Sequence, residues 1–309
     1  MRYFKLINGT GETLDITTQE YFFHEIKGLG FDTENSFRIS GDVWLLSSSR
    51  YTQQPVSGKM SFTDIGNTGP YEKYFLFSRF IEKRPLTLLY YPEGLSRRQY
   101  CRTVMVKELA KSELNKCGIL EEEISFLPLT PWYRSFSDSN DTGEGEDETT
   151  GWIWGKEENG VYVTPPLVFE PTDGQNATRA KFRAEPRLYT IIRSDSSNEG
   201  PVKLIIHGPA VNPLWTHYVD GTAVETGGFD EEFSLSESET LTVDNMTGEY
   251  IMTVFDSSTG ITRNVYSLRD FDKLCFFSLQ EGTNTFTVTT SNGTRVKFDV
   301  EGRVYYATV

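Results

Sequence analysis

Short runs of alternating apolar and polar residues dominate this chain. In RTVMVKE, residues 102–108, Val104 and Val106 lie on the face opposite Thr103 and Lys107, which is the period of two that a β-strand gives. Similar runs recur at short intervals through the second half, among them KLIIHG, EYIMTVFD, NTFTVTTS and RVKFDVEG. Turn-forming pairs with glycine separate them. The pattern predicts a mostly β protein.

One segment has a helical period instead. Pro70 stands where a first helical turn would begin, and Tyr74, Phe77 and Ile81 follow at spacings of three and four. The pair Arg84-Pro85 ends the pattern. We expect a helix over about residues 70–83 that crosses an N-terminal β-sandwich.

The composition changes sharply over residues 135–151, SFSDSNDTGEGEDETTG. This stretch is acidic, rich in Ser, Thr and Gly, and too poor in apolar residues to form a core. It predicts an acidic linker or surface loop between a domain of residues 1–134 and a second of residues 152–309. The many short strands of the second domain are typical of a jelly-roll sandwich.

Charge and cysteine content narrow the function classes. The 309 residues carry a formal net charge of −14, which disfavours non-specific attraction to nucleic acid or to anionic lipid. We expect no specific nucleic-acid binding and no membrane insertion. No apolar run is long enough to span a bilayer, and the N-terminus lacks the pattern of a signal peptide. The three cysteines are spaced neither as a metal site nor as a disulfide framework. We expect a protein made in a cytoplasm.

Motifs of catalysis are not found in the sequence. The three histidines, His24, His207 and His217, lie in or beside predicted strands, where a structural role is the simpler interpretation. A nucleophile elbow, a phosphate-binding glycine loop and a zinc-protease helix motif are all missing. We therefore expect no enzyme, no catalytic residues, no cofactor and no metal.

A saccharide-binding module is the alternative function. Jelly-roll sandwiches can stack sugars on exposed aromatic rings, and four rings of the second half are candidates for a saccharide or protein contact: Trp152, Trp154, Tyr162 and Trp215. The competing interpretation, which we favour, is that these rings fill the sandwich core or a subunit contact.

The order of motifs along the whole chain resembles the distal tail proteins (Dit) of long-tailed phages, the siphophages. In the first half the matching runs are RPLTLLYYP, YCRTVMVKELAKSEL and ISFLPLTPWYR. In the second half they are Gly208 after a strand, Asn212-Pro213, LTVDN, Asn264 before VYSL, and FFSLQEGTNTF. The chain departs from the family in its acidic stretch and in the ending VDN.

This resemblance implies a structural hub of the tail tip and baseplate. It implies a homo-hexameric ring of N-terminal domains, with an outward galectin-like jelly roll, that joins the tail tube protein to the tail-associated protein and surrounds the channel for DNA ejection. A receptor-binding protein or a host saccharide would be a further partner, and assembly would take place in the host cytoplasm. The stretch IIHGPAVNPLW would then be a structural turn between two strands.

Residues 27–59 are long for a simple connection. We expect them to form an extended arm or hairpin that lies on adjacent subunits or on the tube, with Phe31, Phe37, Trp44, Leu45 and Leu46 as inter-subunit anchors. An ordinary surface loop is the alternative.

Overall fold

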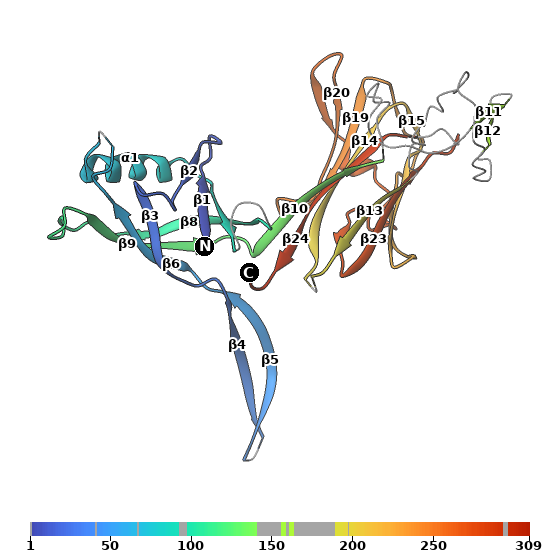
Figure 1. Cartoon of the computed structure of the whole chain (residues 1–309). Coiled ribbons are helices and arrows are strands. Elements are labelled where there is room, and N and C mark those ends of the chain that lie inside the picture. The colour runs from blue at the N-terminus through green and yellow to red at the C-terminus, as the bar shows by residue number, and fades with distance from the viewer. Residues whose placement is uncertain are drawn as a thin grey trace, which may run out of the picture. The chain divides into compact units, whose positions relative to one another are not determined.

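The computed structural model describes residues 2–40, 42–66, 68–92, 98–140, 156–158, 161–163, 189–196, 198–292 and 296–309. They divide into two compact units. The first unit takes Met1–Phe136, Asp195–Gly200 and Arg303–Val309, and the second takes the described parts of Ser137–Ser194 and Pro201–Gly302. Figure 1 shows the chain with its labelled elements. Each unit is β-rich, so the predicted mostly β fold is confirmed.

The first unit is built from these elements: β1 (Tyr3–Ile7), β2 (Thr13–Asp15), β3 (Tyr21–Lys27), β4 (Phe31–Ser40), β5 (Val43–Gln53), β6 (Val56–Phe62), α1 (Pro70–Glu82), β7 (Leu86–Tyr91), β8 (Tyr100–Leu109), β9 (Leu120–Pro128) and the start of β10 (Trp132–Ser139). The antiparallel order is β2-β1-β7-β8-β9-β6-β3. Within β8 a register shift lies between Val106 and Glu108. Such irregularities bend a sheet.

The two halves of this sheet enclose one aromatic core. Phe4 of β1 packs on Phe23 of β3 and on Tyr90 of β7, with ring centroids 5.7 and 4.8 Å apart. Helix α1 adds Phe77 and Ile81 to the same core. The helix spans Pro70–Glu82 with Pro70 in its first turn, which confirms the predicted range. The buried face of the helix is narrow, because Phe77 and Ile81 are buried whereas Tyr71 and Phe75 remain exposed.

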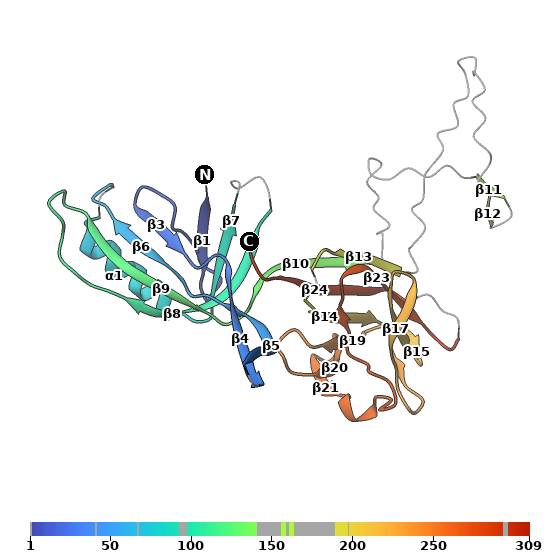
Figure 2. The ribbon, with the colours of Figure 1, turned by 90° about the horizontal axis from the view of Figure 1, so that it is seen from below.

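The second unit contains β11 (Lys156–Glu158), β12 (Val161–Val163), β13 (Tyr189–Ser194), β14 (Gly200–His207), β15 (Ala210–Val211), β16 (Leu214–Val219), β17 (Thr222–Gly227), β18 (Ser234–Leu235), β19 (Glu239–Asp244), β20 (Ile251–Asp256), β21 (Ile261–Asn264), the 3-10 helix η1 (Tyr266–Leu268), β22 (Ser278–Leu279), β23 (Gly282–Thr289) and β24 (Phe298–Tyr306). One sheet has the order β24-β14-β19-β20-β21 and another the order β13-β23-β16-β17. Figure 2 gives a second view of them.

Strict alternation explains the sandwich of the second unit. The residues of β14 are buried at every second position, with Val202, Leu204 and Ile206 inward. The neighbouring β19 and β24 repeat this pattern, and the opposing sheet contributes Trp215 and Phe286. One buried face on each sheet is what an antiparallel sandwich requires.

The expected domain limits differ from these units at three places, one of which is Asp195–Gly200 in the first unit. Residues 303–309 belong to the first unit, where Tyr306 packs edge-to-face on Tyr100 with centroids 5.3 Å apart. The predicted linker began at residue 135, but β10 continues to Ser139 and Asn140 is buried. Polar composition misled the prediction because both atoms of the Asn140 side-chain amide are paired inside the unit. Residues 141–151 lie outside the described part of the chain. Within the described part, no helix is long and apolar enough to cross a membrane.

Candidate functional site

Strands β4 and β5 form a long two-stranded hairpin, which we call the arm (Figure 1). All ten residues of β4 are exposed. The arm pairs from Phe31 opposite Gln53 to Ser40 opposite Val43, with a register shift after Ser36. Ser47 is the additional residue, and its hydroxyl donates to the carbonyl oxygen of Ser36 at 2.9 Å. Residues 31–40 and 43–53 therefore pair as a β-hairpin with one bulge, and they are not an irregular loop.

The register sorts the arm into two faces. Cross-strand partners share a face, so Phe37 lies with Leu46 and Ile39 with Trp44. These four side chains are 53–68% exposed, and the rings of Phe37 and Trp44 contact edge-to-face at 6.2 Å. We call this the apolar face of the arm; Phe31, further down the hairpin, points to the same side by strand alternation.

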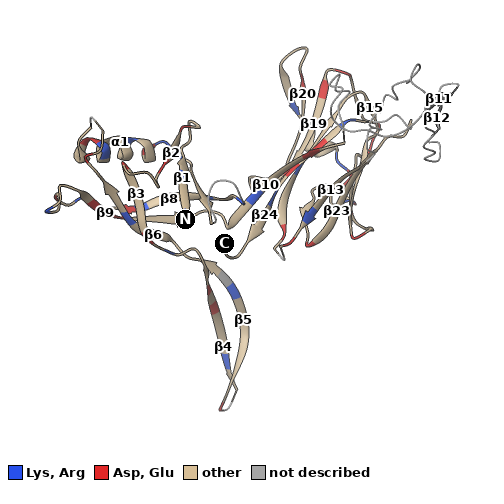
Figure 3. Cartoon of the chain, viewed as in Figure 1, with Lys and Arg blue, Asp and Glu red and all other residues tan. Residues whose placement is uncertain are grey.

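The other face has a different character. It carries Val43 and Leu45 near the tip and the ion pair of Glu34 with Arg50 further down. Four of the five predicted anchors thus share one face, and Leu45 lies on the opposite one. Charged residues of both signs lie along the hairpin (Figure 3): Asp32, Glu34, Arg38, Asp42 and Arg50.

The root of the arm is held by a buried arginine. Arg102 of β8 is fully buried, and its guanidinium donates to the carbonyl oxygens of Thr130 at 3.1 Å and Gln54 at 3.2 Å and to Oε1 of Gln53 at 2.5 Å. It also lies over the ring of Trp132, 5.0 Å from the centroid. Burial lowers the pKa of Arg102 to about 10, so the group is still cationic at pH 7. Among the described residues no carboxylate pairs with it within 4.0 Å. Its hydrogen bonds instead fix the residues at which β5 ends.

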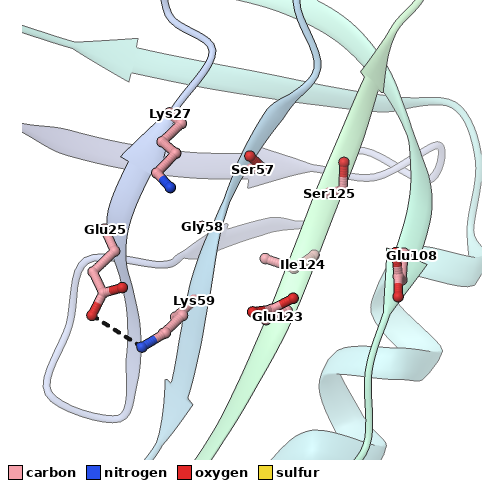
Figure 4. A pocket seen from close by; sticks show the side chains of 9 residues that line it. All are labelled: Glu25, Lys27, Ser57, Gly58, Lys59, Glu108, Glu123, Ile124 and Ser125. Carbon is pink, nitrogen blue, oxygen red and sulfur yellow. Dashed lines mark hydrogen bonds and ion pairs between the residues drawn. The ribbon is translucent and has the colours of Figure 1, made fainter.

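A shallow hollow lies on the outward side of β3, β6 and β9, shown from close by in Figure 4. The inward side chains of these strands join the core, whereas Lys59, Glu121 and Glu123 point outward. Lys59 Nζ pairs with Glu25 at 3.1 Å and with Glu121 at 3.2 Å, and these bonds raise the pKa of Lys59. Three carboxylates and two amines line the hollow. We call this surface the polar face of the first unit.

The loop of residues 207–213 in the second unit is a packed turn. A Cβ on Gly208 would lie 1.8 Å from the carbonyl oxygen of Ser236, so only glycine fits there. Asn212 adopts a positive φ of 45°, and its side chain accepts a hydrogen bond from the backbone of Phe233 at 2.7 Å. These contacts agree with the expectation that residues 207–213 are a structural turn between two strands.

The histidines next to this loop are also engaged internally. Nε2 of His207 lies 2.7 Å from Asp299 Oδ2. His217 is fully buried; its Nε2 lies 2.9 Å from Asn284 Oδ1 and its Nδ1 lies 3.1 Å from Glu225 Oε2. Both rings are parts of the sandwich.

Trp215 corrects the saccharide hypothesis. Its side chain is fully buried, and its indole N–H donates to the carbonyl oxygen of Cys275 at 2.8 Å. A ring in the core cannot stack on a sugar. Trp152 and Trp154 lie outside the described residues. Tyr162 lies in β12, which pairs with β11, and its side chain is not among the described parts of the structure.

Comparison with known proteins identifies the first unit. Residues 3–129 match the family described as the distal tail protein, N-terminal domain. These residues form a distal tail protein N-terminal domain. The resemblance seen in the sequence is confirmed for this part of the chain, and the arm and the polar face both belong to the distal tail domain.

Solved structures extend the similarity in fold to the whole chain. A chain of the phage p2 baseplate in its activated conformation with Sr is 18% identical, with a TM-score of 0.59, and all of each chain is covered. The Dit protein of phage SPP1, described as a paradigm of the hub adsorption apparatus in phages that infect Gram-positive bacteria, is 7% identical with a TM-score of 0.59. That comparison covers 98% of this chain and 99% of the other. No curated protein matches the chain in sequence. The chain thus has the fold of phage distal tail and baseplate hub proteins, which are structural proteins of the virion tail.

Sequence reasoning missed two residues of the distal tail domain. Ile39 belongs to the apolar face, 60% exposed and paired with Trp44. Its signal was available, because Phe37 and Ile39 stand two residues apart. Arg102 gave no signal, since a single arginine in a strand pattern is usually exposed.

Proposed function

We propose that this chain forms a hexameric ring through its distal tail domain and joins the tail tube to the tail tip of a long-tailed phage. The observation that carries the ring proposal is the apolar face of the arm. Large side chains that are more than half exposed in one continuous strip mark a surface that another protein covers. The match of residues 3–129 to the distal tail family supports a neighbouring copy as that protein.

The physical case for a neighbouring copy rests on the stability of the arm. A two-stranded hairpin is marginally stable in water without packing on one of its faces. The contact between the arm and an adjacent copy would be heterologous, since the arm of each copy covers a different surface of the next, and such contacts generate rings when the rotation closes. Phe37 and Trp44 would be the dominant anchors, because aromatic residues contribute most to such interfaces.

The polar face is our candidate for the wall of the channel. DNA passing through a lumen needs a hydrated surface that does not neutralise its phosphates. The surface around Lys59 meets this need, because the amine is already paired with two carboxylates. The tube protein above, the tail-associated protein below and a receptor-binding protein are the partners that this assignment implies, with assembly in the host cytoplasm.

The decisive test is the mass of the full-length protein in solution, measured by size-exclusion chromatography with light scattering. Wild type should have six times the protomer mass of 35.2 kDa. The double variant Phe37→Ser/Trp44→Ser removes the two aromatic anchors of the apolar face and should be monomeric while retaining the circular dichroism spectrum of the wild type.

The matched control is Val43→Ser/Leu45→Ser, which changes two equally exposed residues on the other face of the same hairpin. It should remain hexameric. A wild type that is monomeric at high concentration would refute the ring, and a Phe37→Ser/Trp44→Ser variant that still assembles would remove the arm from the interface.

A further inference from the structure

A ridge of aromatic rings in mutual contact covers part of the second unit, well away in sequence from the distal tail domain. It consists of Tyr250, Tyr266, Arg269, Phe271 and Phe276, which we call the aromatic ridge. The ring centroids of Tyr250 and Phe276 are 4.9 Å apart, and those of Tyr266 and Phe276 are 5.9 Å apart. The guanidinium of Arg269 lies 3.9 Å from the centroids of both Tyr266 and Phe271. Tyr250 and Phe271 are 62% and 61% exposed.

The ridge is held by a well-anchored segment. The backbone N–H groups of Val265, Asp270 and Cys275 donate to the carbonyl oxygens of Met252, Gly228 and Thr226, respectively, at 3.0–3.2 Å. The buried Trp215 donates to Cys275, and Asn245 donates to the carbonyl oxygen of Phe277 at 2.9 Å. A segment fixed in this way loses little conformational freedom when a partner binds. The exposed rings are thus presented in a preformed arrangement.

The rim of the ridge is acidic. Segments 228–232 and 265–277 are joined by the hydrogen bonds of Gly228 and Asp230. Together they contain five carboxylates and two basic residues: Asp230, Glu231, Glu232, Asp270, Asp272, Arg269 and Lys273. The two bases are already engaged, Arg269 between its two rings and Lys273 with Asp270.

The carboxylates also repel one another. Burial, followed by the nearby charges of Asp270 and Asp272, raises the pKa of Asp230. A cation placed against this rim would relieve the repulsion, because an opposite charge favours the ionised carboxylate.

We propose that the aromatic ridge docks a segment of another protein that carries lysine or arginine on either side of an aliphatic or aromatic side chain. The apolar part of the segment would contact Phe271 and Tyr250, and its cations would meet the rim. This contact goes beyond the proposed ring, because it involves neither the arm nor the polar face.

The same geometry disfavours the other occupants. A sugar needs an uncovered ring face, but Arg269 already covers one face of Tyr266 and one of Phe271. An anionic membrane or nucleic acid would meet the acidic rim with like charge.

Binding of short synthetic peptides to the full-length protein tests this proposal by fluorescence anisotropy. A fluorescein-labelled peptide of alternating lysine and leucine should bind, and its affinity should fall as salt is raised. Peptides of glutamate with leucine and of lysine with serine should bind at least about tenfold more weakly, since each lacks one half of the complementarity. Failure of the lysine–leucine peptide to bind would overturn the proposal.

Variants locate the binding. Phe271→Ser should weaken binding of the lysine–leucine peptide by about tenfold or more, as expected for an aromatic anchor. The control Ile261→Ser changes a residue that is 64% exposed on β21 and should have no effect. Asp230→Asn/Asp272→Asn should weaken binding and flatten its salt dependence, whereas Glu108→Gln/Glu113→Gln makes the same charge change in the first unit and should not.

Two results would refute the assignment. One is an equal loss of peptide affinity in each variant and its control, which would show that a cationic peptide is attracted to the acidic protein in general. The other is saturable binding of purified oligosaccharides that Phe271→Ser abolishes, which would make the ridge a glycan site.

Discussion

At the scale of single residues, buried polar groups explain how the arm is oriented and how the turns are fixed. Arg102 places a full charge inside the first unit and satisfies it with carbonyl and amide oxygens. An arrangement of this kind is costly to interrupt, because the removal of one member leaves the others buried without partners.

Arg102→Ala should therefore destabilise the first unit by about 3 kcal/mol, since it leaves three acceptors without donors and opens a cavity beside Trp132. Urea denaturation followed by fluorescence would measure the change. Arg50→Ala, which breaks the exposed pair with Glu34, should cost less than about 1 kcal/mol. A similar small loss for Arg102→Ala would show that the guanidinium does not secure the root.

Asp256 supports a pH-dependent turn between β20 and β21. Hydrogen bonds from the hydroxyls of Ser258 and Ser238 lower the pKa of this carboxyl, and the backbone of Ser258 and the hydroxyl of Thr259 act in the same direction. A carboxyl with a lower pKa in the folded state adds stability above its unfolded pKa of about 3.9, and this stability is lost as the pH falls towards the folded value.

The melting temperature of the wild type should consequently fall below about pH 4 more steeply than that of Asp256→Asn. Thermal unfolding at a series of pH values would show this. Asp42→Asn, an exposed substitution at the tip of the arm, should keep the pH profile of the wild type. Parallel curves for Asp256→Asn and wild type would contradict the linkage.

At the scale of elements, strand ends are secured by side chains as well as by ladder hydrogen bonds. Asn140 follows β10, and its amide accepts from the backbone N–H of Phe298 at 2.7 Å and donates to the carbonyl oxygen of Val296 at 2.8 Å. This pairing acts as one more rung beside β24. It also explains why an acidic, serine-rich stretch begins as a strand.

Asn140→Ala should lower the free energy of unfolding by about 2 kcal/mol, because it leaves a buried donor and a buried acceptor unpaired. Asn35→Ala on the exposed arm is the matched control and should lie within about 0.5 kcal/mol of the wild type. Chemical denaturation measures both. Equal stability of the two variants would mean that water replaces the Asn140 bonds.

At the scale of the whole molecule, the two sides of the first unit differ in chemistry. Helix α1 packs on the core side of the sheet, and the polar face points the other way. If the polar face lines a channel in the assembled ring, its charges affect the binding of DNA, whereas the charges on α1 do not.

Glu121→Lys/Glu123→Lys should make the assembled protein retain duplex DNA at low salt in a gel-shift assay, whereas the wild type should not. Glu72→Lys/Glu82→Lys makes the same charge change on α1 and should retain little DNA, since those exposed positions lie on the other side of the sheet. Equal retention by both variants would remove the polar face from the channel wall.

The sequence by itself determined the β-rich class, the helix and the hairpin character of the arm. The strands and the helix each depend on a local period, two for strands such as β14 and three and four for α1, whereas the arm was indicated by the length of the connection over residues 27–59. Local periods can be recognised from the sequence alone, because they follow from the geometry of the backbone and not from contacts with other elements.

The tertiary structure decided which side chains are buried and which are presented. Trp215 and Trp44 are the same residue type in similar strand patterns, yet one is fully buried and the other is 68% exposed. Register placed Ile39 beside Trp44 on the apolar face and moved Leu45 to the other. Only long-range packing could bring Arg102 to the root of the arm, because its partners Gln53, Gln54 and Thr130 are remote from it in the sequence.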